Sequence, residues 1–218
     1  MSVNRVVIDA ANPDSGMLKQ AVALISQGEI LVCPTDTGYA LSVNALDPGA
    51  IERVFRLKGR DYANPMHVAV SSAEEAAKYA YWNEAAEHLS QRFLPGALTL
   101  VLPRRESVPS LLVNGLDTIG VRIPDNKIIL GVSAETGLPL TATSANRSGL
   151  PTPYTTAEIV EQLGEDIEKV AMVLDQGEIR PHELSTIVDL TVTPPRLIRQ
   201  GRIRWEEVSG VLRAGHYI

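Results

Sequence analysis

The segment LKGRDYANPMHVAV, residues 57–70, joins a predicted helix to a predicted strand. Apolar residues at helical spacing precede it, and residues 67–70 are typical of a strand. Two cations, Lys58 and Arg60, flank Gly59 at this junction. In α/β folds ligands gather at the ends of helices and strands, because the loops there expose backbone N–H groups. The pair therefore indicates either a solvated helix end or a site for a ligand with several negative charges.

Outward from this segment, strands and helices alternate along the chain. Apolar runs predict strands over residues 6–10, 30–35, 39–45, 97–103, 118–124, 138–143, 169–175, 185–191 and 195–200. Capping residues predict helices that begin after Asp14 or Ser15, Asp47, Ser72, Asn83 and Thr155, and two more helices are expected over residues 126–135 and 205–212. Because the two kinds of element are mixed rather than segregated, we predict one α/β domain with a mixed β-sheet.

Composition narrows the classes of protein that the chain can belong to. It has 218 residues, of which 44% are hydrophobic and 21% charged, an ordinary globular composition. The sequence contains no run of about 18 apolar residues, so no membrane span is predicted. The N-terminus lacks a signal-peptide pattern. A single cysteine, Cys33, fits a reducing compartment, so a cytoplasmic location is expected. The net charge of −6 argues against a protein that coats nucleic acid.

Four polar segments stand where a predicted strand or helix ends, namely residues 34–38, 58–65, 143–149 and 185–191. None has the spacing of a phosphate-binding P-loop or of a dinucleotide-binding glycine motif. The four histidines are scattered, so we predict no zinc site. For Ser144, a turn hydroxyl bonded to its own backbone remains an alternative to a role in a site.

Seven motifs then resemble the YrdC-like family, in the order found there: PTDTGYALSVNA, LKGRDYANP, LPGALTLVLP, TIGVRIP, TATSANRSG, STIVDLT and LIRQGRI. The resemblance covers roughly residues 14–204, and it implies a YrdC-like domain with a twisted mixed sheet flanked by helices around an open cleft. Residues 1–13 are expected to add an N-terminal strand segment, and residues 205–218 a C-terminal helix and tail. The chain resembles the short, single-domain members.

The resemblance also implies an activity. The enzymatic members of the family are threonylcarbamoyl-AMP synthases, which are nucleotidyltransferases. They join L-threonine, bicarbonate and ATP and release pyrophosphate. A partner enzyme, the tRNA threonylcarbamoyl transferase, then moves the threonylcarbamoyl group to adenosine 37 of certain tRNAs. We expect Mg²⁺ to accompany ATP and to be held mainly by phosphate and water, because no carboxylate cluster is visible in the sequence.

Residue roles follow from the same resemblance. The family signature is a Lys-x-Arg pair and a Ser-x-Asn pair, which implies catalytic and ATP-binding roles for Lys58, Arg60, Ser144 and Asn146. Further ATP contacts are implied for Asn64, Thr118 and Arg199. Contacts with L-threonine are implied for Thr35, Arg122 and Ser185. No general base can be named from the sequence.

One position departs from the family pattern. Members often carry a histidine near threonine where this chain has Ala69, and a histidine, His67, stands two residues earlier. Strand residues repeat their face every second position, so the two side chains are expected to point the same way. We therefore predict that His67 contributes to the threonine pocket. A strand residue packed under the sheet or facing solvent is the alternative.

The physical reason for the cations is repulsion among anionic substrates. Arginine offers a planar fork to phosphate oxygens, whereas lysine offers a compact charge. Both Lys58 and Arg60 are expected to face solvent in the cleft, with Gly59 letting the backbone come close between them. Arg122 is suited to a bidentate pair with the threonine carboxylate.

Two other functions remain open. The same fold serves as a carbamoyl-transferring domain in hydrogenase maturation, although such domains usually belong to larger chains with zinc-finger-like cysteines. Non-catalytic RNA-binding relatives form the second alternative, which the intact signature and the acidic pI of about 5.3 disfavour. We expect tRNA to bind the chain weakly or indirectly, and no membrane partner.

Overall fold

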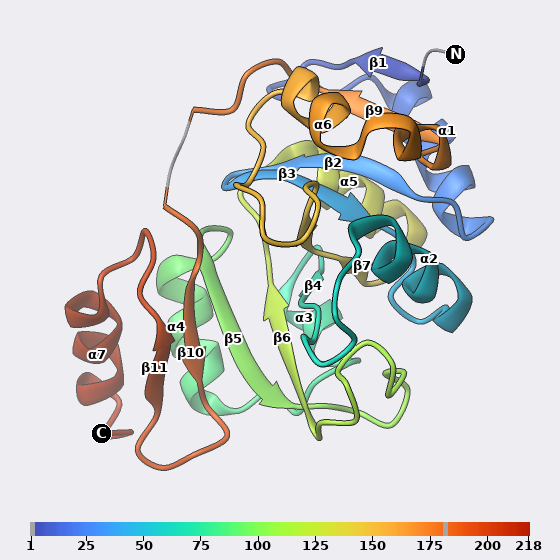
Figure 1. Ribbon diagram of the computed structural model, residues 1–218. Coiled ribbons are helices and arrows are strands. Elements are labelled where there is room, and N and C mark those ends of the chain that lie inside the picture. The colour runs from blue at the N-terminus through green and yellow to red at the C-terminus, as the bar shows by residue number, and fades with distance from the viewer. Residues whose placement is uncertain (1–2, 181–182) are drawn as a thin grey trace.

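Two mixed sheets form the framework of the computed structural model, which describes residues 3–180 and 183–218 (Figure 1). The first sheet has the order β1 (Arg5–Val7), β9 (Met172–Asp175), β2 (Leu31–Thr35), β3 (Gly38–Ser42) and β8 (Thr143–Ser144). The second has the order β11 (Arg196–Arg199), β10 (Thr186–Asp189), β5 (Leu98–Pro103), β6 (Thr118–Arg122), β4 (Val68–Ala69) and β7 (Leu140–Thr141). Both sheets combine parallel and antiparallel pairs. The predicted α/β class is confirmed, and the strands form two sheets rather than one.

Capping residues start most helices at the predicted positions. The helices are α1 (Ser15–Ser26), α2 (Pro48–Lys58), α3 (Ala73–Ala76), α4 (Glu84–Phe93), α5 (Lys127–Thr136), α6 (Thr156–Leu163), α7 (Trp205–Ala214) and a 3₁₀-helix (Gly164–Lys169). Asp14, Asp47 and Asn83 each accept a hydrogen bond from a backbone N–H of the first turn. Thr155 and Glu158 form a reciprocal capping box at α6. The predicted starts are therefore confirmed, because these short polar side chains satisfy N–H groups that have no partner in the helix. None of the helices within the described ranges has the length and apolar character that a bilayer crossing requires.

The core has two parts, which follow from the alternation of side chains along the strands. On β2, Leu31 and Cys33 face a cluster formed with α1 and α5, and Val32 faces the larger cluster between the sheets and helices. Helices α1 and α5 contact each other, and α5 contacts β2. On the other side of the molecule α4 packs against α7, next to the second sheet (Figure 1). The two sheets are thus held by two apolar clusters, of which the larger includes residues of both sheets.

The chain crosses from one sheet to the other at Ala142. Residues 138–143 were expected to form a single strand, and this expectation is wrong. Instead β7 pairs with β4 in the second sheet, and β8 pairs with β3 in the first. Between them the N–H of Ala142 donates to the carbonyl of His67 at 2.9 Å. This crossing brings polar groups of the two sheets to one place.

The first and last described elements, β1 and α7, both join the fold. Strand β1 pairs in parallel with β9, and α7 contacts α4. The division into residues 1–13, 14–204 and 205–218 stays a prediction.

Candidate functional site

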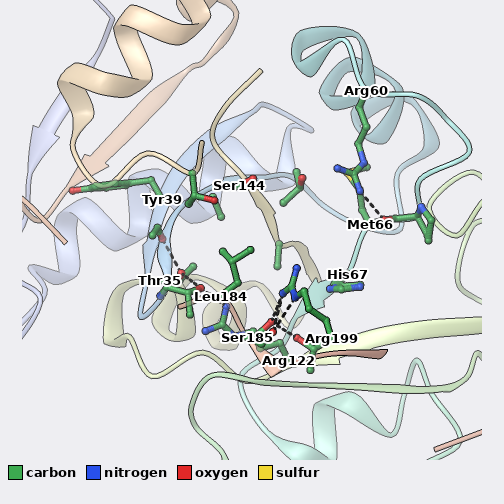
Figure 2. Close-up of a pocket in the computed structure, with 18 residues that line it drawn as sticks. Thr35, Tyr39, Arg60, Met66, His67, Arg122, Ser144, Leu184, Ser185 and Arg199 are labelled. Atoms are coloured by element: carbon green, nitrogen blue, oxygen red, sulfur yellow. Dashed lines mark hydrogen bonds between the residues drawn. The ribbon is translucent and has the colours of Figure 1, made fainter. Parts of the chain in front are cut away.

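A cavity of about 180 Å³ lies between the two sheets (Figure 2). It is smaller than the roughly 300–1,000 Å³ of typical pockets for drug-sized ligands, so its enclosed part suits a molecule the size of an amino acid. Seven of the predicted site residues line it: Thr35, Arg60, His67, Arg122, Ser144, Ser185 and Arg199. Residues from four separate polar segments of the sequence therefore meet at one site.

Three arginines supply the charge of the cavity. The Arg60 guanidinium donates to the carbonyls of Asn64 at 3.1 Å and Pro65 at 3.0 Å. That of Arg199 donates to the carbonyl and the hydroxyl of Ser185, at 2.8 and 3.1 Å. Burial lowers the pKa of both guanidinium groups, and the charge of Arg122 adds to the effect at Arg199. Backbone carbonyls hold these arginines in place without neutralising them, so the cavity favours anionic ligands.

Arg122 is buried and more firmly held. Its guanidinium forms an ion pair with Asp36 at 2.5 Å and donates to the hydroxyl of Thr37 at 2.6 Å. Burial lowers its pKa, and the neighbouring carboxylate of Asp36 opposes that shift. Asp36 and Thr37 both lie in the polar segment 34–38 that the sequence indicated, although neither was named as a site residue. The ion pair fixes one edge of the guanidinium and aims the rest at the cavity.

Hydroxyl groups complete the lining of the enclosed, amino-acid-sized part of the cavity. The Thr35 hydroxyl donates to the carbonyl of Gly38 at 2.7 Å, and the hydroxyls of Thr99 and Ser185 lie 2.9 Å apart. Gly38 has a φ of +131°, and a Cβ there would lie 2.7 Å from the Thr152 methyl group, so only glycine fits this turn. The lining residues that sequence reasoning did not name include Thr37, Tyr39, Thr99, Thr143, Thr152 and Leu184. Thr37 and Thr143 lie inside indicated polar segments, whereas Tyr39 and Thr99 lie in predicted strands, where no polar site was indicated.

Lys58 does not face solvent, which corrects the expectation for this residue. It is 2% exposed, and its ammonium donates to the Ser144 carbonyl, to the Asn146 carbonyl at 2.8 Å and to Asn146 Oδ1 at 3.2 Å. An ammonium has three donors, and all three are used here. Burial, together with the smaller effect of the charge of Arg60, lowers its pKa to about 7. Lys58 and Asn146 therefore lie behind the cavity, where they hold the strand that carries Ser144.

A glycine is needed at position 59 for a different reason from the expected one. It caps the C-terminus of α2 in the left-handed conformation, with φ +57° and ψ +35°. A Cβ at this position would meet nothing within 4 Å, so close approach of another group does not explain the glycine. The left-handed turn ends the helix between the two cations. Lys58 is consequently the last helical residue and points inward, and Arg60 follows the turn and reaches the cavity (Figure 2).

Two predicted ATP contacts lie outside the cavity lining. Asn64 is exposed and contributes its carbonyl to Arg60. Thr118 begins β6, whose last residue, Arg122, lines the cavity. Because β4 and β6 run parallel, the start of β6 lies on the side from which residues 64 and 65 enter the sheet. Across residues 3–180 and 183–218, no group of three His, Cys, Asp or Glu side chains could hold a metal ion.

His67 lines the cavity just before β4 begins, and its imidazole packs on Gly120 of β6. Burial lowers its pKa to about 4, and the charges of Arg199, Arg60 and Arg122 act in the same direction. Ala69 is buried in the core cluster with α1 and α5 and does not line the cavity. The period-two argument thus does not extend to His67, which reaches the cavity from the loop before the strand.

Comparison with known proteins agrees with this geometry. A threonylcarbamoyl-AMP synthase from Pyrococcus abyssi is 39% identical over 196 residues, which are 89% of this chain and 57% of that protein. The protein of the same name from Bacillus subtilis is 34% identical over 215 residues, which are 96% of this chain and 60% of that protein. A crystal structure of Pyrococcus abyssi Sua5 complexed with L-threonine superposes with a TM-score of 0.89 at 37% identity, covering 97% of this chain and 61% of that one.

The chain thus spans about three fifths of the length of these relatives. A family model described as telomere recombination, built on the Sua5, YciO and YrdC proteins, matches residues 23–201. That match covers most of the chain and all the residues that line the cavity. The chain belongs to the Sua5/YciO/YrdC family.

Proposed function

We propose that this chain is a threonylcarbamoyl-AMP synthase, which joins L-threonine, bicarbonate and ATP and releases pyrophosphate. The observation that carries the proposal is the cavity itself. Three arginines and several hydroxyls meet in a space the size of an amino acid, within a chain similar to proteins that bear this name. Such a site offsets the repulsion among the anionic groups of the three substrates, and much of the acceleration of phosphoryl-type transfers comes from positioning and charge stabilisation.

The amino-acid end of the site is formed by Thr35, Arg122 and Ser185. Three of the five N–H groups of Arg122 are used by Asp36, Thr37 and the Gly96 carbonyl. Two remain for the carboxylate of L-threonine, in the planar arrangement that carboxylates accept. The relative with L-threonine in its crystal structure supports this choice of substrate.

The nucleotide end begins at Arg60 and Ser144, with Arg199 next to it. Because the enclosed volume is small, ATP extends out of the cavity past Arg60, toward Asn64 and Thr118. The guanidinium of Arg60 binds the phosphates. The Ser144 hydroxyl donates to Asn146 Oδ1, so its oxygen can still accept a hydrogen bond from a donor group of the nucleotide. We assign Mg²⁺ to the triphosphate, with ligands mainly from phosphate and water.

Lys58 and Asn146 are positioning residues in this proposal. They fix the backbone of residues 144–146 through hydrogen bonds that use every donor of the ammonium. Ser144 then stands in the cavity with a defined orientation. This differs from the role of direct phosphate ligand that the family signature implied for Lys58.

In the reaction, the amine of L-threonine and bicarbonate form a carbamate. A carbamate oxygen attacks the α-phosphorus of ATP, and the bond to pyrophosphate breaks. The product then serves a separate tRNA threonylcarbamoyl transferase, and tRNA itself meets the chain weakly or indirectly. We also propose a cytoplasmic location, on the single cysteine and the N-terminal sequence. A carbamoyl-transfer domain of the hydrogenase-maturation kind and a non-catalytic RNA-binding protein are not favoured.

The test is pyrophosphate release by the purified chain. We expect release that requires L-threonine, bicarbonate and ATP together, with a threonylcarbamoyl adenylate of the matching mass. Omitting each substrate in turn is the control. Release that is independent of L-threonine, or the absence of any release with tight binding of tRNA instead, would overturn the proposal.

A further inference from the structure

His67 differs from every other titratable group that lines the cavity. Among the described lining residues these groups are His67, Tyr39 and three arginines. Arginine stays protonated at any pH a protein tolerates. The Tyr39 hydroxyl donates to the Gly177 carbonyl at 2.6 Å, and burial together with the charge of Asp175 raises its pKa. Of these groups, only His67 is neutral and has a ring nitrogen with a lone pair that can accept a proton.

The proposed reaction needs such a group. At neutral pH L-threonine carries an ammonium, which has no lone pair and cannot attack a carbon atom. One proton has to leave before the carbon–nitrogen bond forms. A base within the site speeds this step, and such a base typically raises the rate about 10²–10⁴-fold.

Gly120 makes room for the imidazole. It lies inside β6, where glycine is unfavourable unless another group approaches closely. A Cβ at this position would lie 2.4 Å from His67 Cδ2 and 3.0 Å from Nε2. The φ of Gly120 is not positive, so space rather than backbone conformation is the reason for glycine. The ring of His67 thus has a fixed position on the second sheet.

The surroundings of the ring are cationic. Arg60, Arg122 and Arg199 all act on it electrostatically, and no carboxylate does. The carboxylate of Asp36, next to the cavity-lining Thr35 and Thr37, is paired with Arg122. Within the part of the chain that the structure describes, the imidazole makes no side-chain hydrogen bond. In Figure 2 the imidazole lies below Arg60 and beside Arg199.

We propose that His67 is the base that removes a proton from the ammonium of L-threonine, and that Gly120 is the positioning residue that gives it access. This inference rests on the proposed function. An N–H bond of the ammonium breaks and a ring nitrogen of His67 takes the proton. The freed lone pair forms the C–N bond with bicarbonate, and the C–O bond to the bicarbonate hydroxyl breaks. The leaving hydroxyl takes a second proton from the nitrogen and departs as water. The carbamate and the imidazolium remain in the cavity.

Charge couples this step to substrate binding. In the empty cavity burial and the three arginines keep His67 neutral, with its pKa lowered to about 4. The phosphates of ATP and the carboxylate of L-threonine offset the arginine charges, which raises the pKa while the substrates are bound. After the anionic products leave, the arginines again disfavour the imidazolium, and it gives its proton to solvent. His67 is then ready for the next turnover.

The test compares four variants by their L-threonine-dependent pyrophosphate release, at saturating ATP and bicarbonate, from about pH 7 to about pH 9.5. His67→Gln keeps a polar side chain of similar size but cannot accept a proton. Gly120→Ala displaces the imidazole without changing it. The matched controls are His88→Gln, on the exposed face of α4, and Gly210→Ala in α7, where a Cβ meets nothing within 4 Å.

For His67→Gln we expect a loss of about 10²-fold at pH 7 that shrinks below about tenfold at pH 9.5, because the amine of L-threonine then loses its proton in water. Gly120→Ala shows a smaller loss with the same trend, and the controls show none. In a fifth variant, His67→Ala, added imidazole restores part of the rate. A loss that is equal at all pH values, or no loss, overturns this inference alone. A wild-type chain without L-threonine-dependent release overturns the proposed function and this inference with it.

Discussion

Two groups of residues, which begin only two positions apart in the sequence, show opposite ways to hold a cation. The lysine cluster (Lys58, Ser144 and Asn146) is closed, because each donor of the ammonium has an oxygen partner in the protein. The arginine cluster (Arg60, Arg122 and Arg199) is open, because each guanidinium keeps N–H groups that face the cavity. The difference indicates that a charge which is fully satisfied by the fold contributes structure, and one which is partly satisfied remains available to a ligand.

The largest expected effect comes from a substitution in the open arginine cluster. Arg60→Ala should lower adenylate formation by about 10²–10³-fold, because the charge that develops on the phosphates loses a positioned partner. Its free energy of unfolding should fall by about 1–3 kcal/mol, since two hydrogen bonds to loop carbonyls are lost. Rate assays and denaturant unfolding measure the two quantities.

Arg56→Ala is the matched control for this change. Arg56 lies one helical turn earlier, is exposed and pairs with Glu52 at 2.6 Å. We expect wild-type rates from it. Equal rates in Arg56→Ala and Arg60→Ala would contradict the assignment of Arg60 to the site.

The second prediction concerns a substitution in the closed lysine cluster. Lys58→Ala should lower the free energy of unfolding by about 2–4 kcal/mol, because it leaves buried carbonyl oxygens without donors and opens a cavity. Lys58→Met fills the space but not the hydrogen bonds, so it should recover only part of that loss. Denaturant melts of both variants decide the point, and a wild-type midpoint for Lys58→Ala would show that the lysine cluster does not stabilise the fold.

The third and smallest expected effect is a shift in the pKa of His67, which depends on the charge of the arginine cluster. In the empty protein its pKa is lowered to about 4. Pyrophosphate in the cavity should raise that pKa, by about one unit or more, since it offsets the arginine charges. A ¹H–¹⁵N NMR titration of the imidazole, with and without pyrophosphate, measures the change. An unchanged or lowered value would show that the ligand does not reach the arginines.

The same residue gives a pH dependence of stability with a definite sign. His67 protonates near pH 6.5 in the unfolded chain and near pH 4 in the folded one, so the unfolded chain binds more protons between these values. The contribution of His67 to stability is therefore present in full above about pH 6.5 and is lost as the pH falls to about 4. His67→Gln should flatten the stability curve in this window.

Local signals in the sequence predicted the elements well. Asp14, Asp47, Asn83 and Thr155 mark helix starts, because a capping side chain bonds to backbone within three residues of itself. The polar segments also predicted where the site lies, and seven of the named residues meet in one cavity. Asp36 was not predicted to pair with Arg122, since the two stand 86 positions apart and nothing near either one indicates the other.

By itself, then, the sequence determined the helix starts, most strands, the α/β class and the polar segments that form the site. The tertiary structure alone decided that Lys58 is buried, that residues 138–143 divide between two sheets, and that His67 lies over Gly120. The physical reason is the range of the interactions. Caps and periodic apolar residues act within one or two turns of the chain, whereas the partners of Lys58 lie 86 and 88 positions away and come within reach only when the two sheets close on each other.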